Sequence, residues 1–244
     1  MAVAETETQS DPLLAFRDRF PILERSNYLI NNSLGAMPKA TRASVGRFLD
    51  EWETRGVRSW GDGWWTLQER VGDQIAAVLG VAAGTVSMHQ NIAVALEMIL
   101  SCFRFDGKRN GIVYADRNFP SDQYIYEARQ RLGARLVRVP PAADGISTDA
   151  EQETAAIDDT TLLVANDHVM FRSSALVDVE PIVEKARKVG AFVVLDTFHS
   201  VGVVPLDLGA LGVHAAVGGA LKWLCGGPGN CFLYVDPNEA RTLQ

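Results

Sequence analysis

Short apolar strands alternate with helical segments through most of this chain, and that order constrains its fold more than any other feature. The apolar patterns predict helices at residues 92–101, 121–132, 149–157 and 179–189. Strands alternating with helices are typical of a sheet whose two faces are both covered. We therefore predict an α/β fold with a mostly parallel central sheet, and ligands at the carboxyl ends of its strands. The predicted strands are residues 85–88, 111–114, 135–139, 161–165, 191–196, 215–218 and 232–235.

The first 84 residues follow a different pattern. Residues 1–11 carry acidic side chains and no Lys or Arg, which indicates a frayed tail and not a secretory signal. We assign residues 1–27 to an N-terminal tail and helix, and residues 28–244 to one large domain. The elements expected here are helices at 12–25, 38–55 and 66–79, a short strand at 28–32, and a Gly- and Trp-rich loop at 56–65.

Composition excludes several classes of protein. The chain has 23 Lys and Arg against 30 Asp and Glu, a net charge of −7, which argues against sequence-independent binding of nucleic acid. It has no apolar run of about 18 residues, so a membrane-spanning helix is not expected. Its three cysteines, Cys102, Cys225 and Cys231, form no CxxC pair and no zinc-type spacing. We expect no metal site, and free thiols in a reducing cytoplasm.

An apolar predicted strand ends at Asp196, and His199 follows three residues later. The ordinary interpretation of Asp196 is a turn or capping residue. The functional interpretation is a carboxylate at the carboxyl end of a buried strand, facing a cationic group of a ligand. A buried carboxylate stays ionised only beside a positive partner. This feature alone leaves both interpretations open.

Lys222 lies between small and apolar residues, just before Trp223 and the glycine-rich segment 226–229. It could be a surface lysine beside a turn. Its apolar flanks favour partial burial, which lowers the pKa of an amine and makes it a usable nucleophile. The glycines allow the backbone to approach a ligand closely.

Taken together, Asp196, His199 and Lys222 resemble the class V aminotransferase branch of the pyridoxal 5'-phosphate (PLP) enzymes of fold type I. Three more segments, at residues 118–122, 167–174 and 203–208, are similar to segments of kynureninase and its relatives. The resemblance covers residues 28–235 and implies the fold type I large domain.

The resemblance also implies a role for each matched residue. Lys222 would form the Schiff base with PLP and Asp196 would face the pyridine nitrogen, so these two are the expected catalytic residues. Phe119 would cover the ring, and the turn at 90–92 would bind the phosphate through backbone N–H groups. The expected cofactor-binding set is Asn91, Ile92, Phe119, Asp122, Ser173, Asp196, His199 and Lys222.

Three positions depart from the kynureninase pattern. Leu221 stands where those enzymes usually have Tyr, Ile92 where the family's phosphate turn has Thr, and Ser174 where the family has a Gly after its Thr. These departures weaken the prediction of kynurenine hydrolysis more than the prediction of PLP binding.

The resemblance implies a homodimer that acts on a small-molecule substrate, an amino acid. The tryptophans Trp60, Trp64 and Trp65 would line a substrate pocket, or pack against the partner subunit or the core. The chain stops at Gln244, soon after the last predicted strand, whereas relatives continue into a smaller domain with an arginine for the substrate carboxylate. We expect that small domain to be largely absent.

Several functions remain open on the sequence. The leading hypothesis is a PLP-dependent enzyme, either kynureninase-like or class V aminotransferase-like. A second is a truncated, degenerate PLP-fold protein without activity. A third is a relative of the cysteine desulfurase or isopenicillin epimerase type, although Cys225 and Cys231 lie beside the glycine loop and not on a late mobile loop. A nucleotide-binding protein is disfavoured because the chain lacks GxGxxG after its first strand and lacks GxxxxGK[ST].

Overall fold

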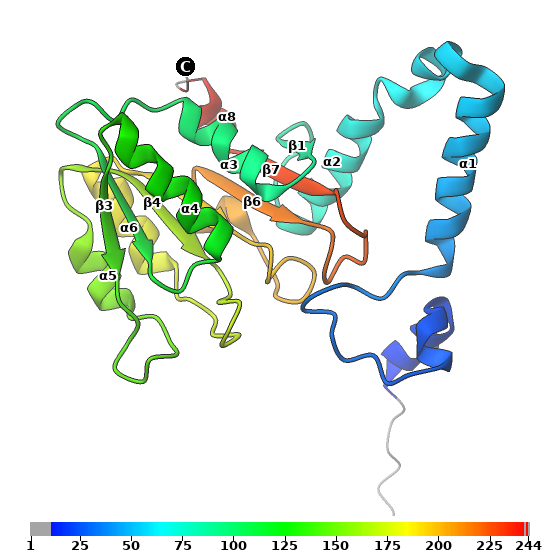
Figure 1. Ribbon diagram of the computed structural model, residues 1–244, viewed down its shortest axis with the longest axis horizontal. Coiled ribbons are helices and arrows are strands. Elements are labelled where there is room, and N and C mark those ends of the chain that lie inside the picture. Colours follow the sequence, from blue (N-terminus) through cyan, green and yellow to red (C-terminus); the bar gives the residue numbers. More distant parts are fainter. Residues whose placement is uncertain (1–10, 242, 244) are drawn as a thin grey trace, which may run out of the picture.

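A seven-stranded sheet forms the centre of the protein. The computed structural model describes residues 11–241 and 243. The strand order is β1-β7-β6-β5-β4-β2-β3; β7 runs antiparallel to both of its neighbours, and the other pairs are parallel. The expected mostly parallel α/β fold is confirmed (Figure 1). The strands are β1 (Val86–His89), β2 (Gly111–Ala115), β3 (Arg135–Val139), β4 (Thr161–Asp167), β5 (Phe192–Asp196), β6 (Ala215–Gly219) and β7 (Cys231–Val235).

Helices cover both faces of this sheet because its strands are apolar on both sides. On one face, α3 (Ile92–Ser101) and α4 (Pro120–Ala128) pack in one core cluster with residues of β2, β4, β5 and β6. On the other face, α2 (Leu67–Leu79) and α6 (Glu180–Val189) pack in a second cluster. The remaining helices of this part are short: α5 (Ala150–Ala156), α7 (Leu208–Leu211) and α8 (Pro237–Ala240).

Strand direction collects functional side chains at one edge of the sheet. Since β1 and β6 are each antiparallel to β7, they run parallel to each other and to β5, β4 and β2. Their carboxyl ends therefore meet at the same edge, together with the start of β7. The loops that follow these strands are the ones that can line a common site.

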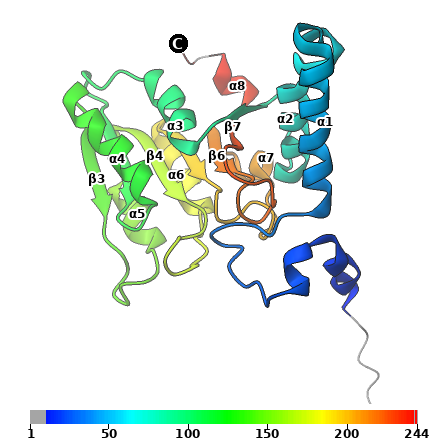
Figure 2. The same ribbon diagram turned by 45° about the vertical axis from the view of Figure 1, so that its right-hand side comes forward.

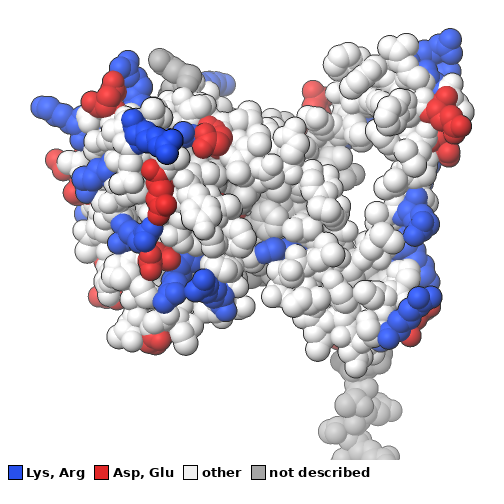
Figure 3. Space-filling model, in the orientation of Figure 1, with Lys and Arg blue, Asp and Glu red and all other residues white. Residues whose placement is uncertain are grey.

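Helix α1 (Lys39–Arg55) stands away from the sheet layers, as Figures 1 and 2 show from two directions. None of its residues is buried. The space-filling view shows this arm projecting beside the body of the protein (Figure 3). Its apolar side chains Val45, Leu49 and Trp52 are all more than half exposed. Among the described residues, no helix is both long enough and apolar enough to cross a bilayer.

The N-terminal part differs from three predictions. Residues 28–32 form no strand; they lead into a turn in which the Asn31 side chain accepts a hydrogen bond from the Ala36 N–H (3.0 Å). Residues 12–25 form two 3-10 helices, Pro12–Arg19 and Pro21–Glu24, because a proline interrupts the backbone hydrogen bonding. The loop at 56–65 coils into a 3-10 turn, Gly56–Arg58, and a π turn, Trp60–Trp64. Residues 1–10 of the predicted tail lie outside the described residues.

Candidate functional site

A cavity of about 520 Å³ opens at the edge where the strands end. Most of its lining residues come from the segments that follow β1, β2, β5 and β6, and from the segment that precedes β7. Aromatic and aliphatic side chains make most of its wall, and a few polar groups are set among them. The lining residues are Asn32, Ser33, Gln90, Asn91, Ile92, Phe119, Phe171, Asp196, Phe198, His199, Leu221, Lys222, Pro228, Gly229, Asn230 and Cys231.

Lys222 is the buried amine of this cavity. It follows β6 by three residues, and only 8% of its surface is exposed. Its Nζ contacts His199 Nε2 and lies 5.0 Å from the ring centre of Phe198 and 5.8 Å from that of Phe119. Burial lowers the pKa of the Lys222 amine, while the nearby carboxylates Asp196 and Asp167 act in the opposite direction. A lowered pKa increases the share of neutral, nucleophilic amine.

Asp196 ends β5 beneath the cavity and is 5% exposed. Its Oδ1 accepts a hydrogen bond from the Phe198 N–H (2.6 Å), which fixes the carboxylate at the end of the strand. Burial raises the pKa of Asp196, and Lys222 partly offsets this effect. The two residues that the sequence paired as catalytic therefore meet at one site.

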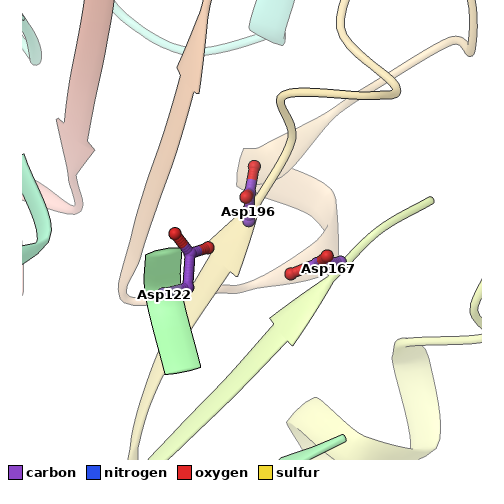
Figure 4. Close-up of side chains that lie close together, drawn as sticks. All are labelled: Asp122, Asp167 and Asp196. Atoms are coloured by element: carbon purple, nitrogen blue, oxygen red, sulfur yellow. The ribbon is translucent and has the colours of Figure 1, made fainter. Parts of the chain in front are cut away.

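Asp196 is one of three buried carboxylates that converge behind the cavity (Figure 4). Asp122 lies in the first turn of α4 and Asp167 ends β4; both are fully buried. The three offer oxygens that all lie within 4.8 Å of one another. Burial and mutual repulsion raise the pKa of Asp122 and of Asp167 well above the usual range. The group is an acidic cluster with Lys222 nearby, and the expected absence of a metal stays a prediction.

His199 lies over Lys222 at the cavity wall. Trp223 Nε1 donates to the His199 carbonyl (3.0 Å), so the two loops that carry His199 and Lys222 are tied together. Burial and the Lys222 charge lower the pKa of His199 to about 4, so its imidazole is neutral at physiological pH. The Nε2 atom of the neutral ring can then accept a hydrogen bond from the Lys222 ammonium group.

Phe119 is the N-cap residue of α4, and it lines the cavity. The ring centre of Phe119 lies 5.1 Å from that of Phe171, in an edge-to-face arrangement, and 5.9 Å from that of His199. Together these rings form one side of the cavity. Phe119, which the resemblance expects to cover the cofactor ring, thus lies in the cavity wall, where it could cover a planar ligand.

The turn after β1 provides the start of α3 beside the cavity. Asn91 caps this helix: its Oδ1 accepts from the Val94 N–H (2.9 Å). Asn91 and Ile92 both line the cavity, so the first N–H groups and the positive end of the helix dipole lie there. The Ile92 N–H lies against the Cys231 thiol, whose pKa burial raises to about 11.

Two predicted residues do not line the cavity. Asp122 contributes to the carboxylate cluster behind it, as described above. Ser173 is half-buried in the loop after β4, where its Oγ accepts from the Ala175 N–H (3.2 Å). The next residue, Ser174, has φ of 59°, a conformation that favours glycine. This is the position where the resemblance expected Gly.

The sequence interpretation missed the N-terminal wall of the cavity. Asn32 and Ser33 line it, and the Gly35 N–H donates to the Leu221 carbonyl (2.9 Å). A Cβ at residue 35 would lie 2.0 Å from the Lys222 carbonyl oxygen, so only glycine permits this approach. The run of turn-forming residues Asn31, Asn32 and Ser33 before a glycine was the available signal. Phe171, Phe198 and Asp167 were missed as well.

A model of the aminotransferase class-V family matches residues 27–244. The chain belongs to the aminotransferase class-V family, as the sequence resemblance predicted.

Kynureninases are among the similar curated proteins. The chain is 34% identical over 244 residues to the kynureninase of Burkholderia pseudomallei (strain 1106a), a match that covers 97% of this chain and 58% of that enzyme. It is 31% identical to the kynureninase of Geobacillus thermodenitrificans (strain NG80-2), covering 91% of this chain and 54% of that enzyme. The chain thus spans little more than half the length of these relatives.

Solved structures share the fold at low identity. A mutant of C-DES with glycine covalently linked to its PLP cofactor superposes with a TM-score of 0.83 at 19% identity, over 93% of this chain and 61% of that one. The apo cysteine desulfurase of Thermococcus onnurineus gives a TM-score of 0.80 at 20% identity, over 98% and 60%. These matches confirm the predicted fold type. The predicted domain boundaries and the missing small domain stay predictions.

Proposed function

We propose that this chain is the cofactor-binding part of a PLP-dependent enzyme that acts on an amino acid, with a kynureninase-like reaction as the first candidate. The observation that carries the proposal is the burial of the Lys222 amine at the same cavity as Asp196. PLP, when bound, supplies an aldehyde that takes up an amine and a ring that accepts electrons.

The residues present fit this cofactor. Lys222 offers the amine, and Asp196 offers an anion for a protonated ring nitrogen. His199 lines the cavity, and its Nδ1 is buried and has no hydrogen-bond partner within the described part of the chain. Such orphaned atoms are costly unless a ligand satisfies them. The start of α3 at Asn91 suits an anionic group such as a phosphate.

The chain's own residues would divide the work at this site. Lys222, when neutral, can also take a proton from the bound substrate or return one, since its lowered pKa brings it toward the working range. His199 would hold the Nζ of Lys222 in place. Phe119 and Phe171 would exclude water from one side of the cavity.

The desulfurase alternative receives less support from this site. Its chemistry needs a thiolate nucleophile. Of the two cysteines near Lys222, Cys231 is buried with its pKa raised to about 11, and burial also raises the pKa of Cys225. Both thiols are therefore protonated at neutral pH. An aminotransferase reaction remains the second candidate, because it uses the same amine and carboxylate. The degenerate, inactive alternative is disfavoured because Lys222, Asp196 and His199 are all present and meet at one cavity.

Reductive trapping tests the cofactor proposal. The purified chain is mixed with PLP, reduced with borohydride, digested and analysed by mass spectrometry. We expect the mass of one reduced cofactor on the peptide that contains Lys222, and none on peptides that contain the exposed Lys39 or Lys188. Uniform low labelling of all lysines would refute a specific site. The readout does not depend on turnover.

We also propose that the chain forms a homodimer in the cytoplasm. The support for association is the exposed apolar arm α1, with Trp60 and Trp65 exposed at its far end. The support for a reducing compartment is that all three cysteines are free. Sedimentation velocity at micromolar concentration with PLP is expected to give a dimer. A stable monomer under these conditions would contradict the association.

A further inference from the structure

Asp167 is a buried aspartate at the end of a strand, and the proposed cofactor site gives it no role. It is the last residue of β4 and the register partner of Asp196 on β5. Partners on neighbouring parallel strands point to the same face, so both carboxylates lie on the side covered by α3 and α4. Asp167 is completely buried, yet it does not line the cavity.

One oxygen of Asp167 holds the backbone of the loop after β2. Its Oδ2 accepts a hydrogen bond from the Phe119 N–H (2.8 Å). A second tie comes from Asn118, whose Nδ2 donates to the Ala165 carbonyl (2.9 Å). The end of β4 thus fixes two successive residues of this loop. The bond to Asp167 is the one that a side-chain carboxyl oxygen accepts, so a substitution of Asp167 can remove it.

The other oxygen of Asp167 has no partner. Oδ1 is buried, and within the described residues nothing donates to it. Figure 4 shows the Asp167 carboxylate directed toward the group formed with Asp122 and Asp196. Burial raises the pKa of Asp122, and repulsion from Asp196 and then from Asp167 raises it further. Burial of a third acid without a full set of hydrogen bonds lowers the stability of the fold. We therefore expect Asp167 to have a role at the site.

We propose that Asp167 is a positioning residue that fixes the Phe119 backbone and thereby holds the Phe119 ring over the cofactor. This inference rests on the proposed PLP site. Asp167 contacts no ligand itself; it acts through Phe119, the N-cap residue of α4. Loss of its carboxylate would release the loop and let the ring leave the cavity wall. An asparagine at the same place keeps an acceptor oxygen for the Phe119 N–H and removes the charge.

The first experiment needs no cofactor. Amide hydrogen exchange of Phe119 is followed by NMR in the wild type, Asp167→Ala, Asp167→Asn and the exposed control Asp178→Ala. We expect exchange of the Phe119 amide to become about 10-fold faster or more in Asp167→Ala, and to stay near the wild-type rate in Asp167→Asn and Asp178→Ala. Unchanged protection in Asp167→Ala would overturn the proposal. Where the alanine variant does not fold, Asp167→Ser replaces it.

The second experiment is a double-mutant cycle with PLP. Dissociation constants are measured by absorbance titration for Asp167→Ala, Phe119→Ala and the double variant. We expect Asp167→Ala to weaken binding about 10-fold, Asp167→Asn to bind within about 3-fold of wild type, and the double variant to bind no more weakly than Phe119→Ala. Additive losses would overturn the proposal, because Asp167 would then act independently of Phe119. If the wild type does not bind PLP, the proposed function fails, and the exchange experiment alone decides whether Asp167 anchors Phe119.

Discussion

Replacement of Lys222 by alanine is expected to abolish covalent attachment of PLP altogether. Of the five lysines in the chain, Lys222 alone is buried, and it lies beside Asp196 at the cavity. Only its amine combines a lowered pKa with a nearby anion for the ring nitrogen. Borohydride-stable incorporation, measured by intact mass, should fall from about one cofactor per chain to background.

The matched control is Lys185→Ala, because Lys185 is a half-buried lysine on α6 that does not line the cavity. It should incorporate the cofactor as the wild type does. Retained stoichiometric incorporation in Lys222→Ala would show that another amine carries the cofactor and that the site is wrongly assigned. A circular dichroism spectrum confirms that each variant is folded before labelling.

Glu153→Gln is expected to stabilise the fold at alkaline pH. Glu153 on α5 is 2% exposed, and its Oε2 accepts from Asn166 Nδ2 (2.5 Å) while Oε1 has no partner within the described residues. Burial raises its pKa from 4.5 to about 7. Burial favours the neutral form of Glu153. Once the pH rises and the group must ionise, its burial lowers the stability of the folded state.

The sign of the effect follows from proton binding. Between pH 4.5 and about 7, the folded chain holds a proton on Glu153 that the unfolded chain has released, so stability falls as the pH rises through this window. Above pH 7 the full penalty applies, about 3 kcal/mol for a shift of this size. Glutamine does not titrate, so the Glu153→Gln variant does not carry this penalty.

Urea unfolding at pH 5 and pH 8.5 measures this difference. The gain in unfolding free energy of Glu153→Gln over wild type should be larger at pH 8.5 than at pH 5 by about 2.5 kcal/mol, because part of the penalty already applies at pH 5. Glu151→Gln, an exposed change on the same helix, should leave the pH dependence as it is. Parallel pH profiles of wild type and Glu153→Gln would contradict the burial argument.

Sequence alone was sufficient for the sheet and for the central pair of residues. Strands β2 and β4 to β7 are mostly apolar and buried, so their pattern predicts them directly, whereas β3 carries two exposed arginines. Asp196 and Lys222 follow such strands, and parallel topology brings their ends together. The irregular segments were harder: at residues 28–32, a short apolar stretch ending in polar turn residues suggested a strand, but the described residues form no strand there.

The contacts between distant segments were not predictable in the same way. Asp167 belongs to a segment similar to kynureninases, but its bond to the Phe119 amide depends on how the loop after β2 folds back. Ser173 was assigned by similarity to a motif, and the structure places it outside the cavity wall. Such details depend on tertiary geometry, which a local pattern does not encode.

The close approach of Gly35 to Lys222 has a consequence for the order of folding. The cavity wall joins a segment near the start of the chain to one near its end, through the bond from the Gly35 N–H to the Leu221 carbonyl. Contacts of such large sequence separation form late, because a long loop must close first. During synthesis the wall cannot exist until Leu221 and the residues after it have left the ribosome. We therefore expect nascent chains that end before residue 221 to be unable to capture the cofactor, however well their central strands have folded.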